Sequence, residues 1–318
     1  DGRGYVYKCS ATTSYSKGQW TMHVSTIIVS YNTFDLTVAA IESAIDASPE
    51  IQHEIIVVDN NSPDKSGPRL QERFNSPEYS AVTIIVLERN LGFSAANNVG
   101  AKHAEGDVLF FLNPDTIVHS GAISELHSFL IQHPEVGALG PYVLNPDGSD
   151  QESVGSFVSL RSLLRLLIPT FAMFQKGFAK KTVLPASTSE VDIVKGCAIA
   201  MRREVYDQIG GWDESYFLYA EERELCFAAR ERGYQNYFLR SASIVHIGGA
   251  STNRENYADQ QVIQQRSSLQ FMKRHHGRAM VNLNRALGIL RFGLRASIFP
   301  ILKLLTGQSH YDMRGKAA

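Results

Sequence analysis

Residues 54–62, EIIVVDNNS, form a run rich in β-branched side chains that ends in Asp59 and an Asn-rich turn. Such a run predicts a strand that is buried on both faces. The same pattern comes earlier in VSTIIVSYN (24–32) and later in VTIIVLERN (82–90) and DVLFFLNPD (107–115). Segments with helical spacing separate these runs, which predicts a parallel sheet with right-handed crossovers.

The rest of the chain is less regular. Helical spacing is clear at 37–48, and 93–104 reads as a helix of small residues. The other predicted elements are a short helix at 69–74, a loop at 143–153, a strand, helix and Gly-Gly-Trp turn within 192–216, a helix at 221–234 and a strand pair at 236–249.

Composition excludes several classes of protein. The chain has 318 residues, 44% of them hydrophobic and 20% charged, so it is neither disordered, collagenous nor a disulfide scaffold. A formal net charge of −1 lacks the electrostatic footprint of a nucleic-acid-binding protein, and we expect no nucleic-acid partner. Cys9, Cys197 and Cys226 show no CxxC and no short metal spacing, which is typical of reduced thiols in a reducing compartment.

Two basic, apolar stretches stand out at 156–181 and 286–307. Neither contains 18 uninterrupted apolar residues, so we expect no transmembrane helix. Basic amphipathic segments of this kind can lie on an anionic membrane surface. The alternatives are core helices with solvated basic faces, or a contact between two copies of the chain.

Polar residues follow each predicted strand of the first half. In open α/β sheets, ligands bind outside the carboxyl ends of the strands. The residues gathered at this edge are Tyr31, Asn32, Asp59, Arg89, Asn90, Asn113 and Asp115.

This polar edge could bind a nucleoside diphosphate. Asp59 can accept a hydrogen bond from a pyrimidine N3–H, and Tyr31 can stack on the base. Asp115 supplies a hard carboxylate of the kind that Mg²⁺ or Mn²⁺ prefers, and Arg89 could add positive charge. The alternative is that Asp59 is a turn residue and Asp115 a helix N-cap.

Later in the chain, Glu221, Glu222 and Glu224 open the helix predicted at 221–234. Acidic residues in a first turn stabilise a helix through its dipole. Adjacent carboxylates also raise one another's pKa, which suits a general base that takes a proton from a hydroxyl. His246 ends an apolar strand, where a lone histidine is more often structural, although the glycines after it permit close approach of a ligand.

The motifs TIIVSYN, EIIVVDNNS, RNLGFSAANNVGAKHAEGDVLFFLNPDT, VKGCAIAMRREVYDQIGGWDESYFLYAEERELCFAARERGY and SIVHIGG occur in this order between Val24 and Gly249. Together they resemble family 2 glycosyltransferases, most closely the bacterial rhamnosyltransferase-like branch. The resemblance implies a GT-A fold, which is an α/β fold with a Rossmann-like, mostly parallel sheet flanked by helices. It also implies inverting transfer from a nucleotide-activated sugar with a divalent metal, Mg²⁺ or Mn²⁺.

On this resemblance we divide the chain into three parts. Residues 1–21 are polar, lack the apolar region of a secretory signal, and are expected to be an extension outside the fold. Residues 22–255 form the glycosyltransferase domain, with a nucleotide-binding half at 22–118 and an acceptor half at 119–255. Residues 256–318 form a basic, amphipathic, helical C-terminal extension.

The resemblance also assigns roles by position. Asp115 and His246 match the metal-binding positions, Glu222 matches the catalytic base, and Glu221 is the second choice for that base. The residues implied in nucleotide-sugar binding are Tyr31, Asn32, Asp59, Arg89, Asn90, Gly92, Asn97, Asn113 and Asp115, and those on the acceptor side are Trp212, Asp213 and Glu214.

The sequence departs from the family pattern at two places. Asn113-Pro-Asp115 stands where the usual motif is Asp-x-Asp, which leaves one carboxylate fewer for the metal. Glu221-Glu222 stands where the usual motif is Glu-Asp, so the matched base is one methylene longer. Reduced activity or an altered acceptor geometry is one expectation from this change.

The expected function is transfer of a sugar, with dTDP-rhamnose as leading donor, to a lipid-linked or polysaccharide acceptor in cell-surface glycan synthesis. We expect a cytoplasmic protein, peripheral on the inner face of the cell membrane. For its assembly, we consider a homo-oligomer. A UDP-hexose donor or a non-catalytic nucleotide-sugar-binding scaffold are the other functions considered. A nucleotidyltransferase is disfavoured because VSTIIVSYNTFD lacks a Gly-rich, basic phosphate loop.

Overall fold

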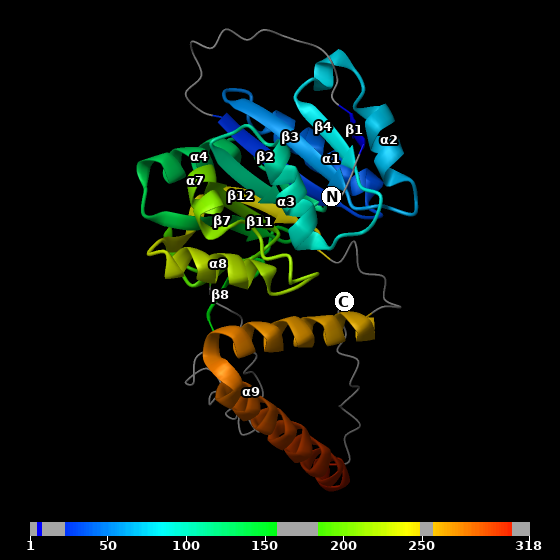
Figure 1. Cartoon of the computed structure of the whole chain (residues 1–318). Coiled ribbons are helices and arrows are strands. Elements are labelled where there is room, and N and C mark those ends of the chain that lie inside the picture. The colour runs from blue at the N-terminus through cyan, green and yellow to red at the C-terminus, as the bar shows by residue number, and fades with distance from the viewer. Residues whose placement is uncertain (1–4, 8–22, 158–183, 249–256, 307–318) are drawn as a thin grey trace. The chain divides into compact units, whose positions relative to one another are not determined.

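The computed structural model describes residues 5–7, 23–157, 184–248 and 257–306. The chain divides into two compact units (Figure 1). The first comprises 1–157 and 182–268, and the second comprises 158–181 and 269–318. The first unit contains the sheet and its covering helices.

Within the described residues, ten strands form one mixed sheet in the order β1-β4-β3-β2-β5-β11-β7-β12-β6, with β9 paired to β12. A separate pair is made by β8 and β10. The strands are β1 (Tyr5–Tyr7), β2 (His23–Ser30), β3 (Gln52–Asp59), β4 (Val82–Val86), β5 (Val108–Leu112), β6 (Thr116–Val118), β7 (Val136–Leu144), β8 (Val154–Gly155), β9 (Ser189–Val191), β10 (Ile193–Val194), β11 (Ala198–Arg202) and β12 (Gln235–His246).

The four strands predicted in the first half are parallel neighbours, as expected. β2 pairs with both β3 and β5, and β3 pairs with β4. In this register Ser30 lies beside Asp59, and Ile28 lies beside Leu112. The carboxyl ends of these strands therefore meet at one edge, where the polar residues that follow them gather. Beyond β5 the sheet is mixed, because β11 runs antiparallel to both β5 and β7.

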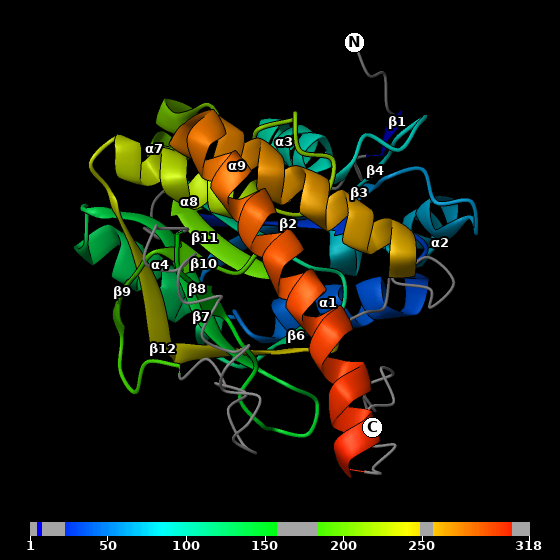
Figure 2. The same ribbon diagram turned by 90° about the horizontal axis from the view of Figure 1, so that it is seen from below.

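Helices cover both faces of the sheet. Val24 and Ile28 of β2 point into a core shared with α1, α2 and α4, whereas Ile27 points into a core shared with α3, α7 and α8. Figure 2 shows α1 and α3 on opposite sides of β2 and β3. The helices of this unit are α1 (Phe34–Asp46), α2 (Ser66–Arg73), the 3₁₀ helix η1 (Pro77–Tyr79), α3 (Phe93–His103), α4 (Ala122–Gln132), α7 (Arg203–Ile209) and α8 (Glu221–Glu231).

The elements of the second half that the sequence did not predict include α4 and β7. Residues 136–144, VGALGPYVL, contain two glycines and a proline, which are depleted in strands. The segment is a strand because β11 and β12 pair with it on either side, and glycine is accommodated because a Cβ at Gly140 would lie 2.8 Å from Val194. The loop predicted at 143–153 starts two residues too early, because β7 runs to Leu144, and the strand pair predicted at 236–249 is the single strand β12, with register shifts against β7.

One boundary needs correction. Residues 5–7 lie in the segment expected to be outside the fold, yet they form β1 and pair antiparallel with β4. An edge strand presents unpaired backbone N–H and C=O groups, and β1 pairs with those of β4.

The second unit contains most of α9 (Tyr257–Thr306), which is kinked at Gly277. Met272, before the kink, and Val281, after it, share a small apolar cluster. No helix in the described ranges combines the length and apolar character that crossing a bilayer requires. The basic stretch at 286–307 continues this helix to Thr306. The other stretch, 156–181, lies almost entirely outside the described residues.

Candidate functional site

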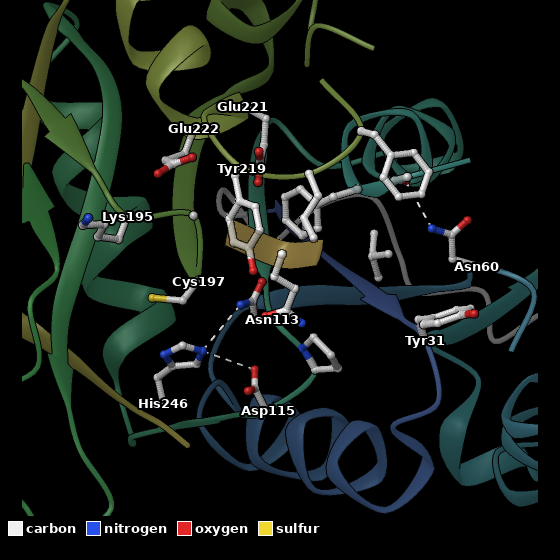
Figure 3. Close-up of a pocket in the computed structure, with 18 of the residues that line it drawn as sticks. Tyr31, Asn60, Asn113, Asp115, Lys195, Cys197, Tyr219, Glu221, Glu222 and His246 are labelled. Atoms are coloured by element: carbon white, nitrogen blue, oxygen red, sulfur yellow. Dashed lines mark hydrogen bonds and ion pairs between the residues drawn. The ribbon is translucent and has the colours of Figure 1, made fainter. Parts of the chain in front are cut away.

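A cavity of about 630 Å³ opens at the carboxyl edge of the parallel strands, within the first unit (Figure 3). It is lined by residues that lie far apart in the sequence. Of the residues predicted to form the site, those that line it are Tyr31, Asn90, Gly92, Asn113, Asp115, Glu221, Glu222 and His246.

Asp115 and His246 point toward one another at one end of the cavity (Figure 3). Asp115 follows β5, and His246 is the last residue of β12. The antiparallel pairing of β6 with β12 sets Thr116 opposite His246. As a result, Asp115 Oδ1 lies 3.3 Å from His246 Nε2, and Asn113 Nδ2 lies 3.5 Å from the same nitrogen.

Asn60 ties the loop before α3 to the end of β3. Its Nδ2 donates to the carbonyl of Gly92 at 3.2 Å, and its Oδ1 accepts from the Leu91 N–H at 2.8 Å. The Phe93 N–H in turn donates to the carbonyl of Phe217 at 2.9 Å. These hydrogen bonds join the predicted nucleotide-binding half of the domain to the segment that precedes α8.

Glu221 and Glu222 enter the cavity from the first turn of α8 (Figure 3). Glu221 is only 6% exposed, and its Oε2 has no hydrogen-bond partner among the described residues. Burial, and then the charge of Glu222, raise the pKa of Glu221 to about 8. The Glu221 carboxyl is therefore mostly protonated at neutral pH.

Three residues predicted at the nucleotide edge do not line the cavity. Asp59 is 1% exposed, and its carboxylate accepts from the backbone N–H and the hydroxyl of Ser62 at 3.0 and 2.6 Å. Burial raises the pKa of Asp59 against the lowering effect of these bonds. Asn32 is exposed, and its N–H donates to Ser62 Oγ. Arg89 is exposed outside the cavity wall. Because its carboxylate is hydrogen-bonded to Ser62, Asp59 holds the loop that follows β3.

Four further predicted residues also lie outside the lining of the cavity. Asn97 is buried in α3, where its Nδ2 donates to the Phe93 carbonyl. Trp212 is 1% exposed and packs edge-on against the Phe93 and Phe111 rings, so it cannot contact an acceptor from its present position. In the turn after Trp212, Asp213 accepts from the Ser215 N–H and Glu214 accepts from Asn98 Nδ2.

Sequence reasoning missed several cavity residues. Among the described residues that line the cavity, Lys195 is the one lysine or arginine, and it pairs with Glu152 at 3.5 Å. The only signal for Lys195 was its position in the VKGCAIA motif. Gln151 gave no signal because it falls in a predicted loop. Cys197, which was predicted only to be a reduced thiol, also lines the cavity, and its burial raises its pKa to about 12.

No group of three or more His, Cys, Asp or Glu side chains in the described ranges could by itself hold a metal ion. The Asp115–His246 pair could supply two ligands. Mg²⁺ sites are commonly built from one or two carboxylates together with substrate phosphates. Asp115 supplies one such carboxylate at the wall of an open cavity, and His246 would add a nitrogen ligand.

The profile of the family described as Glycosyl transferase family 2 matches residues 25–210, more than half of the chain. The chain belongs to glycosyl transferase family 2. This confirms the resemblance drawn from the motifs.

Curated relatives of this glycosyltransferase include enzymes of cell-surface glycan synthesis. An N-acetylglucosaminyl-diphospho-decaprenol L-rhamnosyltransferase of Mycobacterium tuberculosis is 27% identical over 63% of this chain and 68% of its own length. The O-antigen biosynthesis protein RfbC of Myxococcus xanthus is 27% identical over 73% of this chain but only 18% of its own length. The chain thus spans about two thirds of the first relative and less than a fifth of the second.

Solved structures share the fold. The mannosyltransferase PcManGT from Pyrobaculum calidifontis, in complex with GDP-Man and Mn²⁺, has a TM-score of 0.60 at 15% identity, over 93% of this chain and 80% of that one. GalNAc-T7 with UDP, GalNAc and Mn²⁺ has a TM-score of 0.56 at 17% identity, over 71% and 43%. These neighbours confirm the GT-A fold of this glycosyltransferase.

Proposed function

We propose that this glycosyltransferase moves a sugar from a nucleoside diphosphate to an acceptor hydroxyl with inversion at the anomeric carbon. One observation carries the proposal: the Asp115–His246 pair and the Glu221–Glu222 pair line the same cavity. An inverting transfer needs two such groups, one to hold the departing diphosphate and one to take a proton from the attacking hydroxyl.

The donor set of Asp115 and His246 fits a divalent cation. A carboxylate oxygen and an imidazole nitrogen converge at 3.3 Å beside Asn113, and the open cavity leaves room for diphosphate oxygens. Mg²⁺ or Mn²⁺ bound there would supply positive charge to a leaving diphosphate. Lys195 offers a second positive charge, in the role that sequence analysis gave to Arg89.

Glu222 is the proposed base. Glu221 holds its proton at neutral pH, because it is buried and lies beside the charge of Glu222. Glu222 is less buried and lines the cavity, so its carboxylate can accept a proton from a bound hydroxyl. As the proton passes to Glu222, the acceptor oxygen bonds to the anomeric carbon. The bond from that carbon to the diphosphate breaks on the opposite side, and the nucleoside diphosphate leaves.

The relatives support the proposed substrates. We take rhamnose from dTDP-rhamnose as the leading donor, and a lipid-linked or polysaccharide hydroxyl at the inner face of a bacterial membrane as the acceptor. The Mycobacterium tuberculosis relative is named as a rhamnosyltransferase that acts on a decaprenol-linked acceptor. A UDP-hexose donor remains the alternative for the same machinery.

Replacement of Glu222 by Gln tests the base. We expect turnover to fall by about 10²–10⁴-fold, because general-base catalysis contributes that much, while donor binding persists. Transfer is measured with Mn²⁺ and each donor, and binding by the rise in melting temperature that a bound ligand produces. Glu231→Gln, at the exposed end of the same helix, is the matched control.

The same assays separate the alternatives. Normal turnover by Glu222→Gln, or loss of turnover by Glu221→Gln instead, would overturn the base assignment. A thermal-shift response to UDP-hexoses without one to dTDP-rhamnose would change the donor. Binding of nucleotide sugars without transfer or hydrolysis of any of them would identify a scaffold.

A further inference from the structure

The hydrogen bonds of Gln151 determine which nitrogen of the His246 ring carries a proton. Gln151 Nε2 donates to the backbone carbonyl of His246 at 2.9 Å and to Asn145 Oδ1 at 2.8 Å. A backbone carbonyl can only accept, which fixes the nitrogen end of the Gln151 amide at this position. The oxygen end, Oε1, then lies 2.6 Å from His246 Nδ1.

The turn that carries Gln151 fixes the orientation of Asn145 as well. Asn145 Nδ2 donates to the carbonyl of Asp150 at 3.1 Å and to Ser149 Oγ at 3.0 Å, so Asn145 Oδ1 is left to accept. The Gln151 N–H donates to the Val143 carbonyl at the end of β7. Backbone carbonyls therefore anchor both amides of this network.

The orientation of the Gln151 amide determines the protonation of the His246 ring. Because Gln151 Oε1 is an acceptor only, His246 Nδ1 carries the hydrogen that bridges them, and the neutral ring keeps its lone pair on Nε2. That lone pair faces Asp115 Oδ1 at 3.3 Å. Two acceptors that face each other at this distance repel, and a cation bound to both would remove the repulsion.

We propose that Gln151 is a positioning residue, which holds His246 in the Nδ1–H tautomer so that Nε2 can bind a divalent cation together with Asp115. The inference rests on the proposed function, since it concerns the metal of that reaction. Gln151 lines the same cavity but acts on the ring from the side opposite to the one that faces Asp115. Partners of this kind fix the tautomer and the ring orientation of metal-binding histidines.

Gln151→Met tests the proposal, since methionine keeps the length of the side chain and removes the acceptor. Mn²⁺ is titrated at constant pH with dTDP present, and free Mn²⁺ is followed by electron paramagnetic resonance. We expect Gln151→Met to weaken Mn²⁺ binding by about 10- to 100-fold, the usual effect of removing such a partner. Ser149→Ala is the matched control, because it loosens the same turn and leaves every contact of Gln151 in place.

A second readout separates positioning from mere structural support. In metal-free protein with ¹⁵N-labelled histidine, long-range spectra distinguish a protonated ring nitrogen from an unprotonated one. We expect His246 to carry its hydrogen on Nδ1 in the wild type and in Ser149→Ala, and to shift toward the Nε2–H form in Gln151→Met. The His246 signals are assigned by their loss in His246→Ala.

A double variant completes the test, because a residue that acts through His246 has no further effect once that ring is gone. In the His246→Ala background, Gln151→Met should leave Mn²⁺ affinity unchanged. An Nε2–H ring in the wild type, unchanged Mn²⁺ binding in Gln151→Met, or an equal loss in the His246→Ala background would each overturn the proposal. Failure of the wild type to bind Mn²⁺ with any nucleotide would overturn the proposed function instead, while the ring spectra would still decide the tautomer.

Discussion

Glu221 is the residue at which stability and chemistry conflict most directly. Its carboxyl is buried, one oxygen has no partner among the described residues, and a second carboxylate follows it in the chain. A buried polar group without a partner costs about 1–3 kcal/mol. The cost is limited because Glu221 keeps its proton and carries no buried charge. Glu221 lies in the cavity because it is the neighbour of the proposed base.

The raised pKa of Glu221 predicts how stability depends on pH. Between its ordinary pKa of 4.5 and about 8, the unfolded chain releases the proton that the folded chain keeps, so stability falls as pH rises. Glu221→Gln removes this loss. The variant should gain on the wild type by at most about 1.4 kcal/mol per pH unit across that window.

Urea unfolding from pH 4 to pH 9 measures this difference in the free energy of unfolding. The gap between Glu221→Gln and wild type should widen up to about pH 8 and then level off. Glu231→Gln controls for the loss of a carboxylate from the same helix. A gap that stays constant with pH would contradict the raised pKa.

The segment that precedes α8 is held in an unusual conformation. Tyr219 and Ala220 both have left-handed backbones, with φ of 67° and 68°. Such residues cost of order 1 kcal/mol or more each and persist where the surroundings impose them. Two contacts do so here: the Phe217 carbonyl accepts from the Phe93 N–H, and the Leu218 carbonyl accepts from Ser267 Oγ at 2.9 Å. Strain at this position fixes the start of α8 and hence the two glutamates.

Gly92 is the point at which this segment meets the loop before α3. Its φ of 83° and ψ of 174° define a region open essentially to glycine, and a Cβ there would lie 2.7 Å from Phe217. Gly92→Ala should lower the free energy of unfolding by about 1–3 kcal/mol and raise the KM for the donor. Chemical unfolding and donor kinetics check both.

Gly121→Ala is the matched control for this change. Gly121 also has a positive φ, 79°, but nothing lies within 4 Å of a Cβ built there. The Gly121→Ala variant should have a lower free energy of unfolding and an unchanged KM for the donor. Equal changes in donor KM for both variants would argue against a specific contact between the two loops.

At the scale of the whole molecule, we predict that the chain docks on a membrane through α9. Ile289 is 75% exposed and Leu290 is also exposed, within a basic stretch of α9. Exposed apolar side chains among basic residues favour an anionic lipid surface. Deletion of 286–307 should release the protein from vesicles that contain anionic lipid, as measured by co-sedimentation.

Vesicles of neutral lipid are the control for this experiment, since they offer the basic residues no electrostatic attraction, so binding to them should be weaker and insensitive to salt. Replacement of Arg291, Arg295 and Lys303 by Gln should reproduce much of the loss. Unchanged co-sedimentation of the deletion variant would count against membrane docking through this helix.

Sequence alone determined the parallel half of the fold and one end of the site. Buried parallel strands are continuous β-branched runs, and the polar residues that follow them must meet at one edge, so the sequence alone places Asn113 and Asp115 there. The glutamate pair was also visible, because it opens a helix within a specific motif.

Only the tertiary structure decided the rest, since the remaining interactions join residues that are distant in the chain. β7 is a strand because β11 and β12 pair with it on either side, against the local propensity of its sequence. Lys195 and Gln151 carry no periodic signal and reach the cavity through loops. Asp59 and Trp212 have the expected residue types, but packing turned their side chains to the scaffold. Local spacing predicts elements, whereas the direction of each side chain depends on what packs around it.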